Sequence, residues 1–461
     1  MMRMTLRLRL IACVAAAALV LGLGVHADAP FVYAIRGARV VTVTSSPISN
    51  GTVVIRNGLI DAVGADVQPP ADAVVIDGAG LTVYPGLIDM GSSVGLDIQV
   101  PAQQPQTVRS TDEAERWKRS VVLRADVNAA DHVKLDAPEL SRLATSGITT
   151  VLATPPGVLI KGQSALVNVT TPEVEPSVGA IATPRSGVSV VRAPVALHVE
   201  FQNPRGDVYP ASLLGAIAFV RQSFIDAQYQ QLLEQRYQKS PAGMLRPPFD
   251  PALEAMQPAL AARLPVAFEA GLEREVLRAL RMAKEFKLDP IITGAHEADL
   301  AAADLKAQNA RVIYSLNFPT RPRTLAPDAD EPARELRLRA HVSKAPASLE
   351  KAGIVFAFSS GGLSDTHDFL RNVAKAVKDG LADDAAVRAL TINAARIAGA
   401  ADRLGSIEKG KMANLVVADG DLFADRTKIK NVFIDGRQVD LEALGDGAAR
   451  GRGRGAGPGA R

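Results

Sequence analysis

The middle of the chain alternates short apolar runs, which are typical of β-strands, with stretches that have the periodicity of amphipathic helices. Repeated strand-then-helix units build parallel sheets, and the number of units here favours a closed barrel over an open sheet. An open doubly wound sheet lacks its usual mark, since no Gly-x-Gly-x-x-Gly follows a strand and opens a helix. The strand-like runs are 149–153, 195–201, 265–270, 290–293, 312–316 and 355–359, and the clearest helical stretches are 274–287, 299–309 and 368–380.

Both ends of the chain contain short β-rich segments separated by tight turns. Asn57-Gly58 lies between two such segments near the beginning, and Asp435-Gly436 follows one near the end. These residue pairs are typical of two-residue hairpin turns. We therefore predict that both ends contribute to one small β domain beside the barrel. Its expected strands are 38–44, 52–56, 59–63, 73–77, 81–83, 414–418 and 431–434.

The first 27 residues predict export to the periplasm or cell envelope. Three arginines precede the apolar run 10–25, which ends in the small-residue site Val25-His26-Ala27. This order is typical of a secretory signal peptide, cleaved here after Ala27. A membrane anchor is the alternative, because 10–27 is about the minimum length that spans a bilayer. Cys13, the only cysteine, leaves with the signal, which excludes disulfides, cysteine-ligated zinc and thiol catalysis in the mature protein.

The formal net charge of +3 comes from the two ends of the chain. The signal segment carries three arginines and the tail 450–461 carries four, which leaves −4 for the body. The Gly/Arg-rich tail 441–461 cannot build a core and is expected to be disordered. Contact with nucleic acid or anionic surfaces is one use of such a tail, but a solvated tail is the simpler interpretation. We therefore predict no nucleic-acid partner.

Three segments resemble the amidohydrolase superfamily, especially its imidazolonepropionase-like and related exported members. They are the Tyr-Pro-Gly-Leu-Ile-Asp of 84–89, the Ala-Leu-Thr-Ile-Asn-Ala-Ala of 389–395, and the long 403–417 segment containing Gly-Ser-Ile-Glu-Lys-Gly-Lys-Met-Ala-Asn-Leu-Val. The resemblance implies a (β/α)₈ TIM-like barrel with a small β-sandwich formed by both termini. The expected segments are the signal peptide 1–27, the sandwich 28–87 and 405–440, the barrel 88–404 and the tail 441–461.

The same resemblance implies where a metal site would lie. Members usually bind one or two divalent metals through a His-x-His on strand 1, a His on each of strands 5 and 6, an Asp on strand 8, and often a carboxylated Lys or a Glu on strand 4. The metal activates a water molecule for hydrolysis. Here Gly91 and Ser93 stand at the strand 1 positions, Glu269 replaces the strand 5 His, His296 is retained on strand 6, and Gly361 replaces the Asp. His296 and Glu269 alone are too few for a standard site.

Three further residues are pocket candidates. His198 shares one face of its strand-like run with Glu200, because side chains alternate along a strand, and would be a replacement ligand if that face lines the barrel. Asp365 and His367 follow strand 8, where they either cap a helix or build a substitute site. His296 and Glu269 also have structural interpretations, namely a strand-end hydrogen bond and an ion pair with an Arg.

Two hypotheses about function remain open. One is a hydrolase of non-peptide C–N bonds, in amides or cyclic amides, with a degenerate metal site. The other is a catalytically silent barrel that binds a small molecule or a protein partner in the envelope. Neither predicts a tightly bound cofactor, and at most a weakly held divalent metal such as Zn²⁺ is expected. Self-association, or pairing with a related amidohydrolase, is the expected assembly.

Overall fold

The computed structural model describes residues 32–99, 107–134, 142–169, 190–204, 208–326, 328–363, 365, 367–442 and 444. The predicted signal peptide and nearly all of the predicted Gly/Arg tail lie outside these residues. Across the described ranges, no helix combines the length and apolar character that a membrane span requires.

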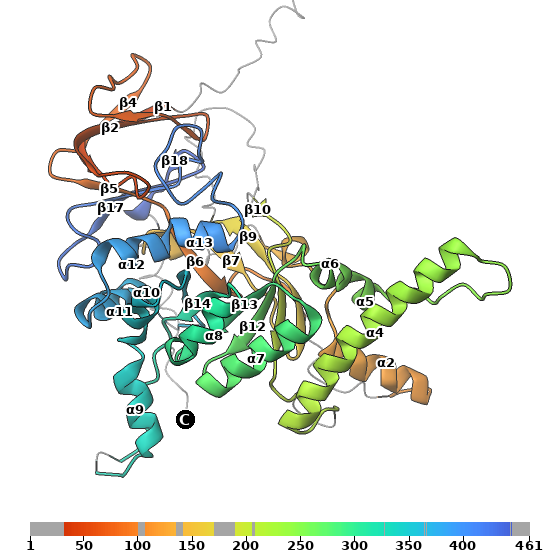
Figure 1. The fold of residues 1–461 in the computed structure, drawn as a ribbon. Coiled ribbons are helices and arrows are strands. Elements are labelled where there is room, and N and C mark those ends of the chain that lie inside the picture. Colours follow the sequence, from red (N-terminus) through yellow and green to blue (C-terminus); the bar gives the residue numbers. More distant parts are fainter. Residues whose placement is uncertain are drawn as a thin grey trace, which may run out of the picture.

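Strands from both ends of the chain share one mixed sheet, which forms the small domain at the upper left of Figure 1. The two ends meet where β5 pairs antiparallel with β16, so that Val83 lies opposite Val417. The first strand ends at Val40, earlier than the sequence suggests, and Val43 adopts a positive φ of 73°. The strands are β1 (Val32–Val40), β2 (Ile48–Arg56), β3 (Leu59–Gly64), β4 (Val74–Asp77), β5 (Thr82–Pro85), β16 (Leu415–Ala418), β17 (Ile429–Ile434) and β18 (Arg437–Gln438).

Both predicted hairpin turns are confirmed. Asn57 and Gly58 have φ of 52° and 80°, and Asp435 and Gly436 have φ of 49° and 75°. Paired positive φ angles define the primed turns that suit the twist of a hairpin. A Cβ atom on Gly436 would lie 2.6 Å from the Cα of Gly58. The two turns therefore pack directly against each other, and glycine is required for this close approach.

The rest of the chain forms an α/β barrel, as predicted. β6 pairs in parallel with β7, and β11 to β15 form a second parallel run. The interior is filled by small and branched side chains such as Ala267, Ile291 and Ile313, and α13 covers it through Ala394 and Ala395. These strands are β6 (Leu87–Ser92), β7 (Ile148–Ala153), β11 (Leu197–Glu200), β12 (Val266–Ala270), β13 (Pro290–Gly294), β14 (Arg311–Ser315) and β15 (Phe356–Ser359).

Helices surround these strands (Figure 1). The predicted helices 274–287 and 368–380 are observed as α7 and α11, and the predicted 299–309 consists of η2 followed by α8. The helices are α2 (Thr111–Val122), η1 (Ala129–His132), α4 (Leu213–Lys239), α5 (Pro251–Ala255), α6 (Gln257–Leu260), α7 (Glu273–Phe286), η2 (Ala298–Ala301), α8 (Ala302–Ala307), α9 (Ala333–His341), α10 (Ala345–Lys351), α11 (His367–Lys378), α12 (Asp383–Leu390) and α13 (Ile392–Ile397).

One strand segment of the barrel runs antiparallel to the other barrel strands. β8 (Ile160–Gln163) pairs antiparallel with β11, and β9 (Ala165–Asn168) pairs antiparallel with β7. Ser164 separates them, so one bent segment joins the two parallel runs. A short strand, β10 (Val190–Arg192), adds antiparallel to β9. The sequence pattern predicts only parallel barrel strands and gives no sign of this segment.

The opposite seam of the barrel joins β15 to β6 through Asp89. The backbone N–H groups of Ser360 and Gly91 donate to Asp89 Oδ1 at 2.7 and 3.2 Å, whereas Oδ2 is buried without a hydrogen-bond partner in the described part of the chain. Burial raises the pKa of this carboxyl to about 6, although the hydrogen bonds from Ser360 and Gly91 oppose the shift. Asp89 therefore links the end of β15 to β6 at this seam.

A buried polar network joins the barrel to the small domain. Asn414, which directly precedes β16, donates through Nδ2 to Asn168 Oδ1 at 2.8 Å and to Thr150 Oγ1 at 3.2 Å. Its Oδ1 accepts from the Asp435 backbone N–H at 2.9 Å, and Asn168 Nδ2 donates to Asp435 Oδ1 at 2.7 Å. Each side chain of the network forms hydrogen bonds with another member, as buried polar groups require. The network therefore sets how the two domains sit together.

Replacing Asn414 by Ala should lower the free energy of unfolding by about 2–3 kcal/mol, because it leaves the Asp435 backbone N–H without its partner and removes one of the two hydrogen bonds to Asn168 Oδ1. Denaturant unfolding followed by circular dichroism measures the change, with the exposed Gln235→Ala on α4 as control. A loss no larger than in the control would show that the network does not hold the domains together.

Candidate site at the barrel mouth

A cavity of about 340 Å³ lies at the carboxyl ends of the parallel strands. Active sites of such barrels are found at this end, because the strand termini and the loops after them converge there. Its polar lining comes from several strands, each contributing one or two side chains. These include Lys161, His198, Glu269, Thr293, Ser315 and Ser359.

Lys161 is the central charged group of this cavity. Its Nζ lies 2.7 Å from Glu200 Oε2 and 2.5 Å from Glu269 Oε2. The side chains of Lys161 and Glu200 are only 11% and 16% exposed, whereas that of Glu269 is 50% exposed. Lys161 and Glu200, both largely buried, therefore neutralise each other. Glu269, the second partner of Lys161, lies on the solvent-facing side of the mouth.

The pKa directions agree with this geometry. Burial alone would lower the pKa of Lys161, but the charges of Glu269 and Glu200 outweigh it and raise the pKa above its ordinary value. Burial raises the pKa of Glu200, an effect that Lys161 opposes and Glu269 reinforces. Lys161 is therefore an ammonium ion at neutral pH.

Lys161 was not among the residues predicted from the sequence. It lies on β8, a strand of four residues that the search for parallel strand-and-helix units did not recognise. The available signal was a single charge inside the apolar run 158–169. A charge in such a run needs a partner of opposite charge, and Glu200 of β11 and Glu269 of β12 provide two.

His198 faces the barrel interior, so the condition left open by the strand alternation is met. Leu197 and Val199 pack outward into the core shared with the helices, and His198 lines the cavity. Its Nε2 is buried without a hydrogen-bond partner in the described residues. Burial, together with the nearby charge of Lys161, lowers the pKa to about 3. The ring is therefore neutral at physiological pH.

The three substituted ligand positions line the same cavity. A Cβ on Gly91 would lie 3.2 Å from Ser359 Cβ. Gly361 has a φ of 57°, and a Cβ there would lie 2.1 Å from Ser315 Oγ. An Asp at this position therefore needs a displaced Ser315 and a strained backbone. Ser93 is exposed at the edge of the mouth.

The other predicted site residues lie elsewhere. His296 is not among the residues that line the cavity; its Nε2 lies 3.2 Å from the carbonyl oxygen of Ser315, and burial lowers its pKa. The exposed Asp365 accepts a hydrogen bond from the backbone N–H of His367 at 2.9 Å, which is the capping role considered from the sequence. His367 begins α11 and lines a different cavity.

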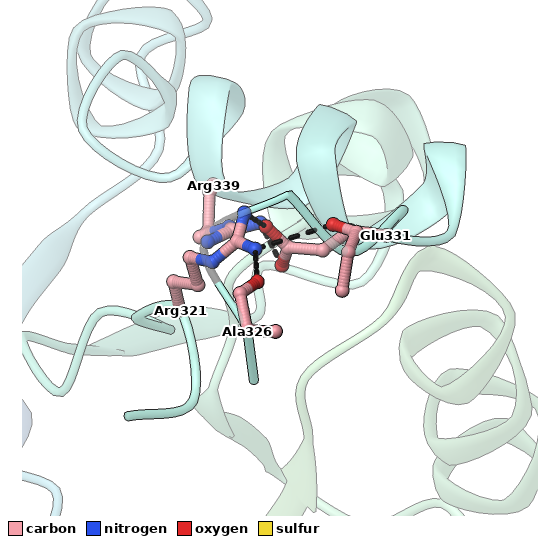
Figure 2. Close-up of polar contacts among 5 residues, drawn as sticks. Arg321, Ala326, Glu331 and Arg339 are labelled. Atoms are coloured by element: carbon pink, nitrogen blue, oxygen red, sulfur yellow. Dashed lines mark hydrogen bonds and ion pairs between the residues drawn. The ribbon is translucent and has the colours of Figure 1, made fainter. Parts of the chain in front are cut away.

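The loop after β14 is held in a defined shape beside the mouth. Figure 2 shows Glu331 between two arginines, with Arg321 Nη1 at 2.8 Å from its Oε1 and Arg339 paired with its Oε2. Arg321 also donates to the carbonyl oxygen of Ala326 at 2.6 Å. Near the start of this loop, Asn317 donates to the Gly361 carbonyl oxygen at 3.1 Å. These bonds fix the loop, and Asn317 connects it to Gly361 of the cavity lining.

The side chains at the mouth do not fit a catalytic metal. Such a site needs three protein ligands with free donor atoms, but the two carboxylates are occupied by Lys161 and the glycines supply no donor. Among the ranges that the structure describes, no three His, Cys, Asp or Glu side chains group to hold a metal ion.

Comparison with known proteins shows which family the carboxyl-terminal part of the chain resembles. Residues 275–439 match the model of the amidohydrolase family. An amidohydrolase from Thermotoga maritima MSB8 is 23% identical, with 88% of this chain and 99% of that chain covered and a TM-score of 0.69. This chain therefore resembles the amidohydrolases over residues 275–439 and shares their fold. Two further solved structures, an uncharacterized protein (20% identity, 88% and 99% covered, TM-score 0.51) and another amidohydrolase (17%, 88% and 98%, 0.50), share the fold. No curated protein matches significantly.

Amidohydrolases usually bind metal, and the mouth of this barrel holds an ion-pair cluster where such ligands would converge. The predicted fold is confirmed, and the predicted resemblance to the amidohydrolases is confirmed over residues 275–439. The predicted site residues are brought together only in part, since His198, Glu269, Gly91, Ser93 and Gly361 line one cavity and the others do not.

Replacing Lys161 by Met should destabilise the protein by about 3 kcal/mol at pH 8, because Glu200 is left buried without a counter-charge. The loss should shrink towards pH 5, since Glu200, whose pKa is raised, binds a proton in the folded state and the buried charge disappears. Denaturant unfolding at both pH values tests this, and Lys161→Met/Glu200→Gln should recover much of the loss. An equal loss at both pH values would contradict the ion-pair account.

Proposed function

We propose that this amidohydrolase-superfamily protein binds a small molecule at the barrel mouth without a resident divalent metal. The observation that carries the proposal is Lys161, whose ammonium group already neutralises the carboxylates of Glu200 and Glu269. Concave sites with a few convergent polar groups on a rigid scaffold are typical of small-molecule binding.

The composition of the mouth indicates which ligand groups it accepts. Ser315, Ser359 and Thr293 supply hydroxyl groups, and Glu269 presents a half-exposed carboxylate. Hydroxyl groups both donate and accept hydrogen bonds, whereas a carboxylate only accepts. An uncharged ligand that carries N–H groups, such as an amide or a cyclic amide, meets both requirements.

Hydrolysis of such a ligand is the second candidate function, and the position of Glu269 favours it. In this reaction Glu269 takes a proton from water as the water oxygen adds to the carbonyl carbon, and returns it to the departing nitrogen as the C–N bond breaks. One water is consumed for each bond broken. Assays of amides and cyclic amides with the wild-type protein and Glu269→Gln separate the two functions, since only hydrolysis gives turnover that this substitution abolishes.

The purified protein should retain less than one tightly held zinc per chain. Elemental analysis after dialysis against a mild chelator tests this, and two retained equivalents would refute the proposal. Restoring the family ligands with Gly91→His, Ser93→His and Gly361→Asp should not recover metal binding by itself, because of the clash between a side chain at 361 and Ser315. Adding Ser315→Gly is the matched test of that clash.

Export to the periplasm or cell envelope is also part of the proposal, supported by the basic, apolar and small-residue order of residues 1–27. The mature protein should begin at Asp28. N-terminal sequencing of protein from the envelope fraction tests this, and an uncleaved, membrane-bound form would refute it.

Assembly with a second copy, or with a related amidohydrolase, completes the proposal. Leu214, Tyr229 and Leu232 are exposed on α4, a long helix at the edge of the barrel (Figure 1). Exposed apolar side chains gathered on one element are typical of protein interfaces. Size-exclusion chromatography of the envelope fraction distinguishes a homo-oligomer from a mixed assembly.

A further inference from the structure

A second, larger cavity lies away from the barrel mouth. Its volume is about 890 Å³, and it is lined along the full length of α11, by residues 422–429 between β16 and β17, and by Thr145 and Ser146 before β7. We call it the α11 groove. It lies between the barrel and the small domain, where ligand sites often occur in multidomain proteins.

The groove has a strong excess of positive charge. Arg371, Lys375 and Lys378 line it from α11 and Lys428 from the opposite side, whereas the only lining carboxylate among the described residues is Asp425. Arg371 is partly neutralised by its ion pair with Asp368. Within the described part of the chain, Lys378 and Lys428 make no ion pair. Lys375 also makes no ion pair there, but its Nζ lies over the Phe318 ring, 5.7 Å from the ring centroid. Lys378 and Lys428 are therefore the cations that remain fully available to an anion.

An unsatisfied hydroxyl group also lines the groove. Ser146 is only 3% exposed, and its Oγ has no hydrogen-bond partner in the described residues. Leaving a buried hydroxyl unpaired is unfavourable. A ligand oxygen in the groove would satisfy it.

The remaining lining is apolar. Leu370 of α11 and Leu422, Phe423 and Ile429 of the small domain contribute side chains that are buried or half-buried. A ligand of this groove therefore needs an apolar body as well as a negative charge. A free inorganic anion would use the lysines and leave these side chains uncovered.

We propose that the α11 groove is a binding site for a small organic anion with an apolar body, such as a carboxylate, sulfonate or phosphate. Lys378 and Lys428 hold the anionic group, Ser146 donates a hydrogen bond, and the apolar side chains cover the body. This site is independent of the ion-pair cluster at the mouth, so either site can be tested without the other.

Fluorescence titration with 8-anilinonaphthalene-1-sulfonate, an aromatic sulfonate, tests the proposal. We expect saturable binding that Lys378→Gln/Lys428→Gln weakens at least tenfold, with inorganic phosphate competing only weakly. The matched control is Lys239→Gln/Lys409→Gln, which removes the same charge from exposed positions elsewhere. Glu269→Gln at the barrel mouth should leave binding unchanged.

A second variant distinguishes binding in the groove from a general effect of the net charge of the protein. Ser146→Leu keeps every charge but places a larger side chain into the groove, and it should also reduce binding, with the melting temperature recorded to verify folding. Absence of saturable binding, an equal loss in the lysine control, or a loss in Glu269→Gln but not in Ser146→Leu would each overturn the proposal.

Discussion

The bent segment from Ile160 to Asn168 is the constraint on which the rest of the structure depends. It pairs antiparallel with β11 through β8 and with β7 through β9, and so closes the gap between two parallel runs. Gly162 makes this path possible, because its φ of 126° suits glycine and a Cβ there would lie 2.5 Å from the Val127 carbonyl oxygen. Without this segment the barrel would have an open side.

The two ends of this segment serve different parts of the molecule. Lys161 near its beginning enters the mouth and holds Glu200 and Glu269, whereas Asn168 at its end enters the buried network with Asn414 and Asp435. One strand therefore couples the charge balance of the mouth to the docking of the small domain.

Regular features of the fold were predictable from the sequence because they depend on local patterns. The strand-like runs that became β12 and β14, and the Asn57-Gly58 turn, follow from periodicity and turn chemistry. The site was harder to predict from the sequence, because it depends on which side chains contact one another across strands. Glu269 was identified as a mouth carboxylate with a cationic partner, but an Arg was expected and Lys161 was missed. Lys161 lies on β8, a barrel strand that runs antiparallel to its neighbour β11, and no local sequence pattern indicates that direction.

Lys161 also determines what the mouth can bind. A divalent cation placed between Glu200 and Glu269 would stand next to an ammonium group in a largely buried site, where repulsion between like charges is weakly screened. Metal binding there requires Lys161 to lose its proton or to move away, and its raised pKa opposes the first. Moving away would strip Glu200 of its partner, a cost comparable to breaking a buried ion pair. Under the proposed function, Lys161 therefore keeps a metal away from the two carboxylates, and a neutral hydrogen-bonding ligand is the occupant that leaves this charge balance undisturbed.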